Sequence, residues 1–271
     1  MLRISGTART HVGLVRTSNE DSAFVGPSCI LVADGVGGGA AGEVASATAA
    51  YAVAATALAS AGEDPITVLT RGFRAAQTQV AAGVEADAAR GGMATTLTAL
   101  VTDGATFALA HLGDSRGYVF RDHELTQVTR DHTYVQDLVD EGRIEAAEVR
   151  AHPWRNVVLR SVNGTADAEA DLLRLHLEPG DRVLLASDGL TDLVSEEEIT
   201  EVLARRGDDS AADSLISAAL ARGGRDNVTC VLATVVDGPA VNSDGQLLGA
   251  VRDPANVVDL TAVRDAPADT A

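Results

Sequence analysis

The sequence predicts an α+β fold in which largely antiparallel sheets are covered by pairs of helices. Short apolar runs rich in β-branched residues recur along the chain, and several end in Asp beside a small or polar residue. Long Ala-rich amphipathic stretches come in two pairs instead of alternating one by one with the strands. The order of strand, helix pair, several strands, irregular stretch, strand, helix pair and strand is typical of α+β proteins.

The individual elements follow from these patterns. The apolar runs predict strands at 29–35, 95–101, 107–115, 116–121, 182–189 and 227–236. The dipeptides at 103–104 and 122–123 fall between neighbouring runs, as hairpin turns do. The amphipathic stretches predict helices at 42–60, 65–90, 196–206 and 210–222. Ser195 and Glu198 have the spacing of a capping box at the start of the third helix.

The charge balance excludes several classes of function. The chain has 271 residues, of which 39 are Asp or Glu and 21 are Lys or Arg, for a formal charge of −18. It has no basic cluster, so we expect no binding to nucleic acid or to an anionic membrane surface. It lacks a long uncharged apolar stretch and an apolar signal core. Cys29 and Cys230 lie in apolar runs, as buried thiols of a reducing compartment do, so we expect a cytoplasmic protein.

Four aspartates stand at or just before the predicted strand ends, namely Asp34, Asp114, Asp188 and Asp226. Each alone fits an ordinary turn, because Asp beside Gly, Ser or Asn is a common turn pair. Several carboxylates aimed at one point repel each other unless cations lie between them. All-oxygen clusters suit Mg²⁺ or Mn²⁺, and two such ions can polarise a bridging water into hydroxide.

A second charged segment, GLVRTSNED at 13–21, supplies Arg16, Glu20 and Asp21. The planar guanidinium of Arg16 suits a tetrahedral oxyanion. Glu20 and Asp21 have the chemistry to bind waters held by a metal ion. Taken alone, the segment fits an exposed loop of mixed charge.

Together these motifs resemble the metal-dependent Ser/Thr protein phosphatases of the PPM family, also called type 2C phosphatases, in their bacterial form. The resemblance covers residues 10–236, and its specificity lies in the ordered set of motifs. They are VRTSNED (15–21), LVADGVGG (31–38), GEVAS (42–46), MATTLT (93–98), HLGDSRGY (111–118), LTQVTRDHTYVQDLVDEGRI (125–144), HPWRNVVLRSV (152–162), LLASDGLTD (184–192) and GGRDNVT (223–229).

The resemblance implies a central antiparallel β-sandwich flanked by helix pairs on both faces, with a dinuclear Mn²⁺ or Mg²⁺ centre at one end. It implies that Asp34 bridges both ions and that the Gly35 carbonyl binds the second. Asp188 and Asp226 hold the first ion. The remaining ligands act through metal-bound waters and are Glu20 and Asp21.

The resemblance also implies the reaction. Arg16 grips the substrate phosphate, and the bridging hydroxide attacks phosphorus in line without a phosphoenzyme. The catalytic set is therefore Arg16, Asp34, Asp188 and Asp226. Some bacterial relatives hold a third ion, which here would use Asp114, Asp188 and Asn156. The implied partners are phosphorylated proteins, with a bacterial Ser/Thr kinase as one candidate, and we expect a monomer.

The sequence departs from the family pattern in three places, and the absence of His at Gly39 and Val36 leaves the general acid open. Val36 takes the usual place of Met, Gly39 stands where many relatives carry His, and Ala94 replaces a usual Gly. His132 is a candidate proton donor, although a structural role is the more ordinary one for a lone His. His111 lies within a predicted strand and is expected to pack in the core.

Other classes of function also fit parts of the sequence. A catalytically silent protein with the same fold would bind phosphoproteins without turnover, but every expected metal ligand is present. GDSRG at 113–117 matches a serine-hydrolase elbow with Ser115 as nucleophile, although a strand-like run follows where a helix is needed. GVGGGA at 35–40 matches a dinucleotide fingerprint but lacks its second parallel strand.

Residues 1–237 are expected to form the phosphatase domain, with a flap at about 131–161. Apolar residues at helical spacing predict a short flap helix from Tyr134 that ends at Gly142. Trp154 is expected to anchor the flap. Residues 238–271 carry Gly, Pro, Asn and Asp without periodicity, which predicts a disordered acidic tail.

Overall fold

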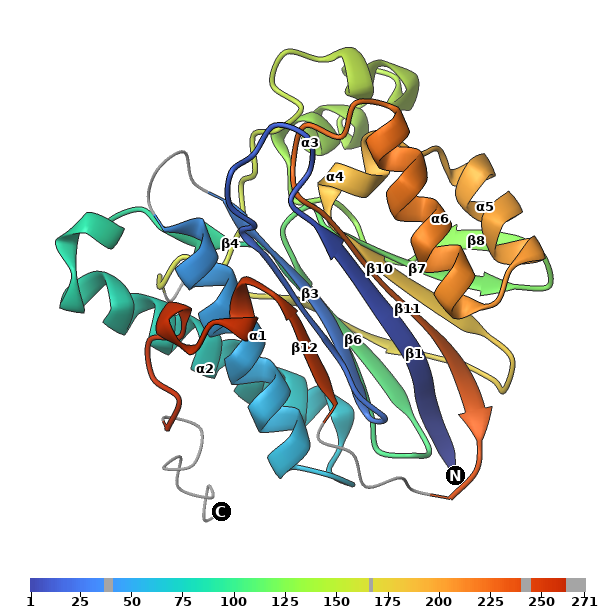
Figure 1. The fold of residues 1–271 in the computed structure, drawn as a ribbon, viewed down its shortest axis with the longest axis horizontal. Helices are drawn as coiled ribbons and strands as arrows, with labels where there is room; N and C mark the ends of the chain where they lie inside the picture. Colours follow the sequence, from blue (N-terminus) through green and yellow to red (C-terminus); the bar gives the residue numbers. More distant parts are fainter. Residues whose placement is uncertain (37–40, 166–167, 240–244, 262–271) are drawn as a thin grey trace.

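The computed structural model describes residues 1–36, 41–165, 168–239 and 245–261. Two antiparallel sheets pack face to face, and helices cover both outer faces, which confirms the predicted αββα sandwich (Figure 1). The first sheet has the order β1 (Leu2–His11), β11 (Val228–Asp237), β10 (Arg182–Ala186), β7 (Arg116–Arg121) and β8 (Glu124–Gln127). The second has the order β12 (Gln246–Gly249), β2 (Asp21–Val25), β3 (Cys29–Val36), β5 (Leu97–Thr102), β6 (Phe107–Leu112) and β9 (Asp171–Leu175), and β4 (Ala94–Thr95) pairs with β3.

The central strands are apolar on both faces because the sandwich has three buried layers. Leu31 and Ala33 of β3 face the helices, whereas Ile30 and Val32 enter the layer between the sheets. This alternation follows from the two-residue period of a strand. Runs such as 29–33 therefore appear in the sequence as unbroken apolar stretches.

The four long helices lie close to their predicted ranges. α1 (Gly42–Ala59) and α2 (Pro65–Ala86) cover the second sheet, and η1 (Ala88–Arg90) follows α2. α5 (Glu196–Arg205) and α6 (Asp208–Ala221) cover the first sheet, and the short α4 (Asp188–Thr191) follows β10. No helix within the described residues is long and apolar enough to cross a membrane.

Capping chemistry explains where the helices begin. Asp64 accepts a hydrogen bond from the Thr67 amide at 3.1 Å, one residue before Pro65 opens α2. The predicted capping box at α5 is half correct. Ser195 Oγ accepts from the Glu198 amide, but the Glu198 carboxylate accepts from Arg222 instead of returning a bond to the cap.

Both predicted hairpin turns are present. Asp122 and His123 join β7 to β8 with φ values of 51° and 67°, as a type I′ turn requires. Gly104 has a φ of 93° in the turn between β5 and β6. Cys29 and Cys230 are buried free thiols, as expected.

Residues 131–161, the segment predicted as a flap and called the flap below, stand over one end of the sandwich (Figure 1). It contains α3 (Tyr134–Asp140) and η2 (Ala146–Ala151), and Gly142 closes α3 with a φ of 67°. The two ends of the flap bond to each other, because the Leu159 amide donates to the His132 carbonyl and Thr133 bridges Val158. Trp154 packs edge-on against Tyr134 and His152 but is 58% exposed, so it anchors the flap only in part.

The predicted disordered tail is wrong for its described part. Residues 246–261 form β12, η3 (Ala250–Arg252) and η4 (Pro254–Asn256), and β12 pairs with β2. Val251 and Val257 bury their side chains among residues of the α1 core. A few apolar residues in a polar stretch were enough to form this contact, and the composition of the whole stretch concealed them. Residues 240–244 and 262–271 of the predicted tail lie outside the described part of the chain.

Candidate metal centre

The predicted acidic residues lie close to one another, since four of the aspartates repel the carboxylate of Asp34. Asp114 and Asp188 share a cavity with residues of the flap. Asp34 lies near the end of β3, and Asp21 at the start of β2 is its antiparallel partner. Asp188 opens α4 just after β10. Asp114 follows β6 and Asp226 precedes β11, so five segments that are distant in sequence contribute to this cluster.

Asp34 is held by its own backbone. Its amide donates to Thr96 Oγ1 at 2.9 Å. Its carbonyl accepts from the Thr96 amide and from Thr95 Oγ1, each at 2.8 Å. Three hydrogen bonds therefore fix the strand on which the carboxylate stands.

Asp21 is fully buried and only half satisfied. Ser187 Oγ accepts from the Thr229 amide at 3.0 Å and donates to Asp21 Oδ2 at 2.9 Å. Asp21 Oδ1 is buried without a hydrogen-bond partner. A buried carboxylate oxygen that lacks a partner is costly, and a cation or a water held by a cation would relieve that cost.

The carboxylates raise each other's pKa. Burial, followed by repulsion from Asp21, Asp188, Asp114 and Asp226, holds the pKa of Asp34 well above its usual range. The pKa of Asp188 is also raised well above its usual range, chiefly by burial and then by repulsion from Asp114. Burial raises the pKa of Asp21 to about 6 and that of Asp114 to about 7. Such a group of repelling oxygens is the kind of site that hard divalent cations stabilise.

Gly35 and Gly42 leave a small space beside this cluster, here called the cradle. A Cβ on Gly42 would stand 2.5 Å from Glu20 Oε2 and 3.1 Å from the Gly35 carbonyl oxygen. A Cβ on Gly35 would lie 2.4 Å from the Gly42 carbonyl oxygen. Both positions therefore require glycine, and two oxygen donors face the space that a side chain would fill. The oxygen-only donor set and this cradle fit Mn²⁺ or Mg²⁺.

Arg16 and Asp226 stand at the entrance of the cluster. Arg16 Nη2 donates to Asp226 Oδ2 at 2.9 Å, and this hydrogen bond raises the pKa of Arg16. Both side chains are nearly half exposed. With Asn156 and Asp188 they line a groove of about 830 Å³ that also includes Arg155 of the flap.

The three residues predicted for a third ion share a second, smaller cavity. Asp114, Asp188 and Asn156 line a space of about 40 Å³ under the flap, together with Asp192 and Asp131. Among the described residues, no three His, Cys, Asp or Glu side chains are grouped as ready ligands of one metal.

Asn227 was missed from the sequence, although it organises the loop that carries Arg16 and Glu20. Its Oδ1 accepts from the Glu20 amide at 2.8 Å, and its Nδ2 donates to the Val12 and Ser18 carbonyls at 2.9 Å. Its carbonyl also requires a neighbouring glycine, because a Cβ on Gly189 would lie 1.9 Å from it. The only sequence signal was its position after Asp226, which suggested an ordinary turn.

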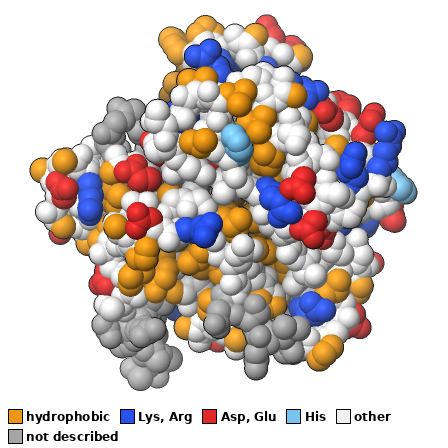
Figure 2. All heavy atoms as spheres, in the orientation of Figure 1, with side chains coloured by type: hydrophobic (Ala, Val, Ile, Leu, Met, Phe, Trp, Pro, Cys, Tyr) orange, Lys and Arg blue, Asp and Glu red, His pale blue; other side chains and the backbone are white. Residues whose placement is uncertain are grey.

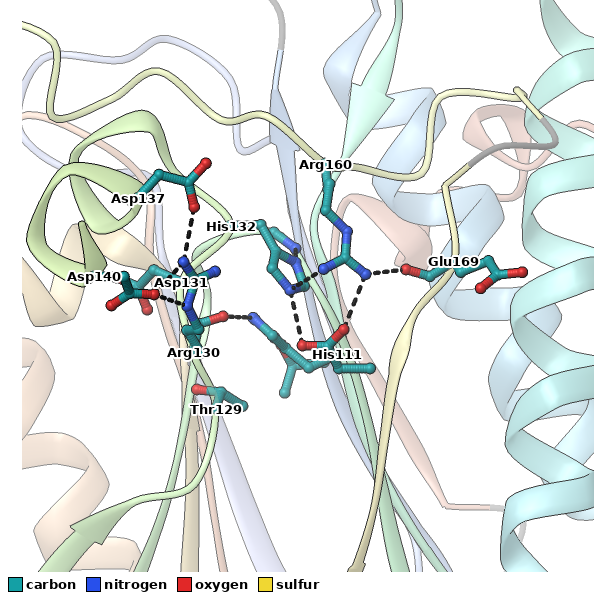
Figure 3. A network of polar contacts seen from close by, with 12 residues as sticks. His111, Thr129, Arg130, Asp131, His132, Asp137, Asp140, Arg160 and Glu169 are labelled. Carbon is teal, nitrogen blue, oxygen red and sulfur yellow. Dashed lines mark hydrogen bonds and ion pairs between the residues drawn. The ribbon is translucent and has the colours of Figure 1, made fainter.

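His132 holds the base of the flap (Figure 3) and is not among the residues that line the groove. Its side chain is fully enclosed, and burial lowers its pKa. Nδ1 accepts from the Gly113 amide at 3.0 Å, and Nε2 lies 3.0 Å from Asp171 Oδ2. Arg160 links this imidazole to the Glu169 carbonyl (Figure 3). The geometry favours the structural interpretation of His132 over that of a proton donor.

His111 is packed in the core as expected. It is buried, and the two ring nitrogens bond with Thr98 Oγ1 and the Arg130 carbonyl at 2.9 and 3.0 Å. Burial, then the neighbouring His132, lowers its pKa to about 3. Arg130 in turn bonds with Asp137 and Asp140 of α3, so the two histidines and this arginine tie the flap to β6 (Figure 3).

The serine-hydrolase interpretation is wrong. Ser115 is fully buried and shares a 2.7 Å hydrogen bond with Thr96 Oγ1, and strand β7 follows it in place of a helix. The dinucleotide fingerprint lies partly outside the described residues, since positions 37–40 are not among them. Gly35, its first glycine, takes part in the cradle described above.

Comparison with known proteins identifies the family. The profile of the protein phosphatase 2C family matches residues 6–223. The serine/threonine protein phosphatase PstP of Mycobacterium tuberculosis is 46% identical over 244 residues, which cover 90% of this chain and 47% of PstP. The serine/threonine phosphatase stp of Listeria monocytogenes is 35% identical over 235 residues, which cover 83% of this chain and 93% of that protein.

A solved structure gives the same result. The catalytic domain of PstP in complex with two manganese ions has a TM-score of 0.82 and 45% sequence identity, over 88% of this chain and all of that one. The chain belongs to the protein phosphatase 2C family, as its motifs predicted. It spans about half the length of PstP (47%).

Proposed function

We propose that this chain is a metal-dependent protein serine/threonine phosphatase that hydrolyses phosphoserine and phosphothreonine. The observation that carries the proposal is the cluster of mutually repelling carboxylates at the end of a protein phosphatase 2C fold, with Arg16 at its entrance. The relatives named above are Ser/Thr phosphatases, and one of them binds two manganese ions.

Oxygen atoms of this chain are proposed as the ligands of two metal ions. In this proposal Asp34 would serve both ions, Asp188 and Asp226 would hold the first, and the Gly35 carbonyl would hold the second. Glu20 and Asp21 act through water. Bound Mn²⁺ or Mg²⁺ neutralises these carboxylates and lowers the pKa of a water that serves as the nucleophile toward phosphorus. A third ion is assigned to Asp114, Asp188 and Asn156, which line one small cavity.

Arg16 is proposed to orient the substrate phosphate. Its guanidinium lies in the groove, where it can donate parallel hydrogen bonds to two phosphate oxygens. Figure 2 shows acidic and basic side chains interspersed on one face of the molecule. Because the net charge is −18, the attraction for a phosphorylated protein must arise inside the groove and not from the surface as a whole.

The proposed substrates are phosphorylated proteins, with a bacterial Ser/Thr kinase as one candidate. We propose residues 1–237 as the catalytic unit, acting as a monomer. The two buried free thiols, Cys29 and Cys230, support a reducing, cytoplasmic location.

Metal removal and restoration test the proposal. Purified protein is assayed on p-nitrophenyl phosphate and on a phosphothreonine peptide, with EDTA and then with Mn²⁺ or Mg²⁺ restored. We expect EDTA to abolish hydrolysis and Mn²⁺ to restore it. Asp209→Asn, at an exposed position on α6, is the matched control for Asp226→Asn, which should lose activity.

Two other outcomes would contradict the proposal. A folded protein that binds the phosphopeptide but shows no turnover with any metal would be a silent phosphoprotein-binding domain. Hydrolysis that persists in EDTA would exclude the metal mechanism.

A further inference from the structure

Residues 246–261, here called the C-terminal strap, form the edge strand β12 of the second sheet and then pass over α1 (Figure 1). β12 pairs with β2, so that Gly249 stands opposite Ser22. The strap is fastened to α1 at its other end, where Tyr51 Oη donates to the Leu260 carbonyl at 2.9 Å. The match to the family profile ends at residue 223, before this segment.

A chain of hydrogen bonds, here called the relay, leads from the strap to the loop that carries Arg16 and Glu20, which is called the metal-binding loop below. The Val251 amide donates to Ser22 Oγ at 3.1 Å. Because an amide can only donate, the Ser22 hydroxyl proton is free to point to Ser46 Oγ, 3.0 Å away. The Ser46 hydroxyl donates to the Glu20 carbonyl. Ser22 and Ser46 are both fully buried, so water does not compete for these bonds.

The end of this relay is the part of the site assigned to the second ion. The Glu20 carbonyl also accepts from the Gly35 amide at 3.2 Å. Ser46 therefore holds the backbone from which Glu20 Oε2 and the Gly35 carbonyl face the cradle at Gly42. A displacement of the Glu20 carbonyl would move both oxygen donors of that cradle.

The strap also packs closely against the backbone of Asp21, the residue before Ser22. Gly249 has a φ of 76°, and a Cβ there would lie 2.1 Å from the Asp21 carbonyl oxygen. Glycine is thus required by both the backbone conformation and the close approach. The strap contacts the chain at Asp21 and Ser22 and, through Ser46, at Glu20.

We propose that the C-terminal strap positions the metal-binding loop and that Ser22 and Ser46 are positioning residues for the cation at Glu20 and Gly35. The inference rests on the proposed metal-dependent function and adds to it a segment that contributes no ligand of its own. Outer residues that orient metal ligands commonly change metal affinity by about 10–100-fold when they are removed.

The experiment measures Mn²⁺ binding to the full chain by isothermal titration calorimetry, together with the melting temperature in EDTA. Ser22→Ala removes the middle of the relay, and Ser46→Ala removes its last step. Tyr51→Phe is the matched control, because it also deletes one hydroxyl that contacts the strap region but has no bond to Glu20. We expect Ser22→Ala and Ser46→Ala to weaken one Mn²⁺ site by about tenfold and Tyr51→Phe to leave both sites unchanged.

The melting temperature separates positioning from simple stabilisation. All three variants are expected to melt slightly below the wild-type chain, since each loses one hydrogen bond. Gly249→Val, which would push the strap off Asp21, should weaken the same Mn²⁺ site as Ser22→Ala. Wild-type Mn²⁺ affinity in both serine variants, with lowered melting temperatures, would overturn the inference and leave the strap as a stabilising element.

Failure of the proposed function would look different. A wild-type chain that binds no Mn²⁺ and does not hydrolyse p-nitrophenyl phosphate would overturn the phosphatase proposal, and this inference with it. A wild-type chain that does both, with serine variants of unchanged affinity, would overturn the positioning role alone.

Discussion

The floor and the rim of the metal centre are built in different ways. The floor consists of Asp21, Asp34 and Ser187, which stand on paired strands or directly after one and are held by hydrogen bonds in the core. The rim consists of Arg16, Asp226 and the flap, and the first two are nearly half exposed and joined by one ion pair. Strand pairing fixes the positions of the floor residues, whereas an ion pair between half-exposed side chains fixes the positions of Arg16 and Asp226.

This difference separates two kinds of task. A dinuclear centre needs oxygens that stay in place while charge changes around them, which a rigid strand end provides. A substrate site needs groups that can exchange partners. Arg16 can leave Asp226 for a phosphate because a half-exposed ion pair is worth only about 0–1 kcal/mol. We therefore expect substitutions of the floor, and of the proposed metal ligand Asp226, to abolish turnover, whereas substitution of Arg16 should change substrate affinity.

The largest effect is expected from Asp34→Asn. It removes the carboxylate shared by both proposed ions, and the loss of several kcal/mol of transition-state stabilisation lowers kcat by roughly 10³-fold. The same change removes a repelling charge from the floor, so the EDTA-treated variant should melt above the wild-type protein. Assays in excess Mn²⁺ and thermal melts in EDTA measure the two effects. Wild-type turnover in this variant would contradict the assignment of the floor.

Arg16→Ala tests the rim. It removes charge-assisted hydrogen bonds to phosphate worth about 1.5–3 kcal/mol, which corresponds to roughly a 10–100-fold higher KM for a phosphothreonine peptide. Mn²⁺ affinity should change little, because Asp226 remains. Arg9→Ala is the matched control, since this arginine pairs with Asp209 and Asp213 on α6. A loss of Mn²⁺ binding in Arg16→Ala with unchanged KM would move Arg16 from the rim to the structural support of the metal.

The sequence predicted the floor better than its surroundings. Strands buried on both faces, such as residues 29–33, are recognisable in the sequence as unbroken apolar runs. The aspartates that follow such runs could therefore be predicted as site residues. β1 was missed because only Ile4 and Ala8 are buried among its ten residues. β12 is four residues long, and nothing in the sequence shows that it will pair with β2.

The supporting residues could not be found for a related reason. Asn227, Ser187 and Ser46 are ordinary polar residues, and their roles depend on partners that lie 24 to 215 residues away. A motif marks the group that does chemistry, because that group's type is constrained. A hydrogen bond that orients it can come from any nearby donor, so its position becomes visible only in the folded chain.

The stability of the metal-free floor should depend on pH. The pKa of Asp21 is about 6 and that of Asp114 about 7, above the usual value of about 4 for an unfolded Asp. These groups bind more protons in the folded than in the unfolded chain. The free energy of unfolding therefore falls as pH rises from the unfolded pKa of about 4 to the folded values of about 6 and 7. In EDTA the protein should melt a few degrees lower at about pH 8 than at about pH 5.5.

Other groups do not reverse this trend. The lowered pKa values of His111 and His132 act in the opposite sense at about pH 6, but the buried carboxyls with raised pKa outnumber them, since Asp34 and Asp188 add to Asp21 and Asp114. Asp171 and Asp181 have lowered pKa values, and the stability that they contribute is lost only below about pH 4, outside the window tested. Saturating Mn²⁺ should flatten the dependence, because the ion replaces the proton as the partner of the carboxylates. A melting temperature in EDTA that rises from pH 5.5 to 8 would contradict the crowding of charges in the floor.

The smallest effect is expected from Ser115→Ala, although Ser115 is only two hydrogen bonds from the floor. Its hydroxyl meets Thr96 Oγ1, which accepts from the Asp34 amide at 2.9 Å. Thr96 also donates its own amide to the Asp34 carbonyl, so Asp34 keeps its support when Ser115 is truncated. We expect about 1 kcal/mol of lost stability and turnover within about twofold of wild type. A loss of activity as large as that of Asp34→Asn would mean that the floor depends on this hydroxyl and that strand register alone does not fix it.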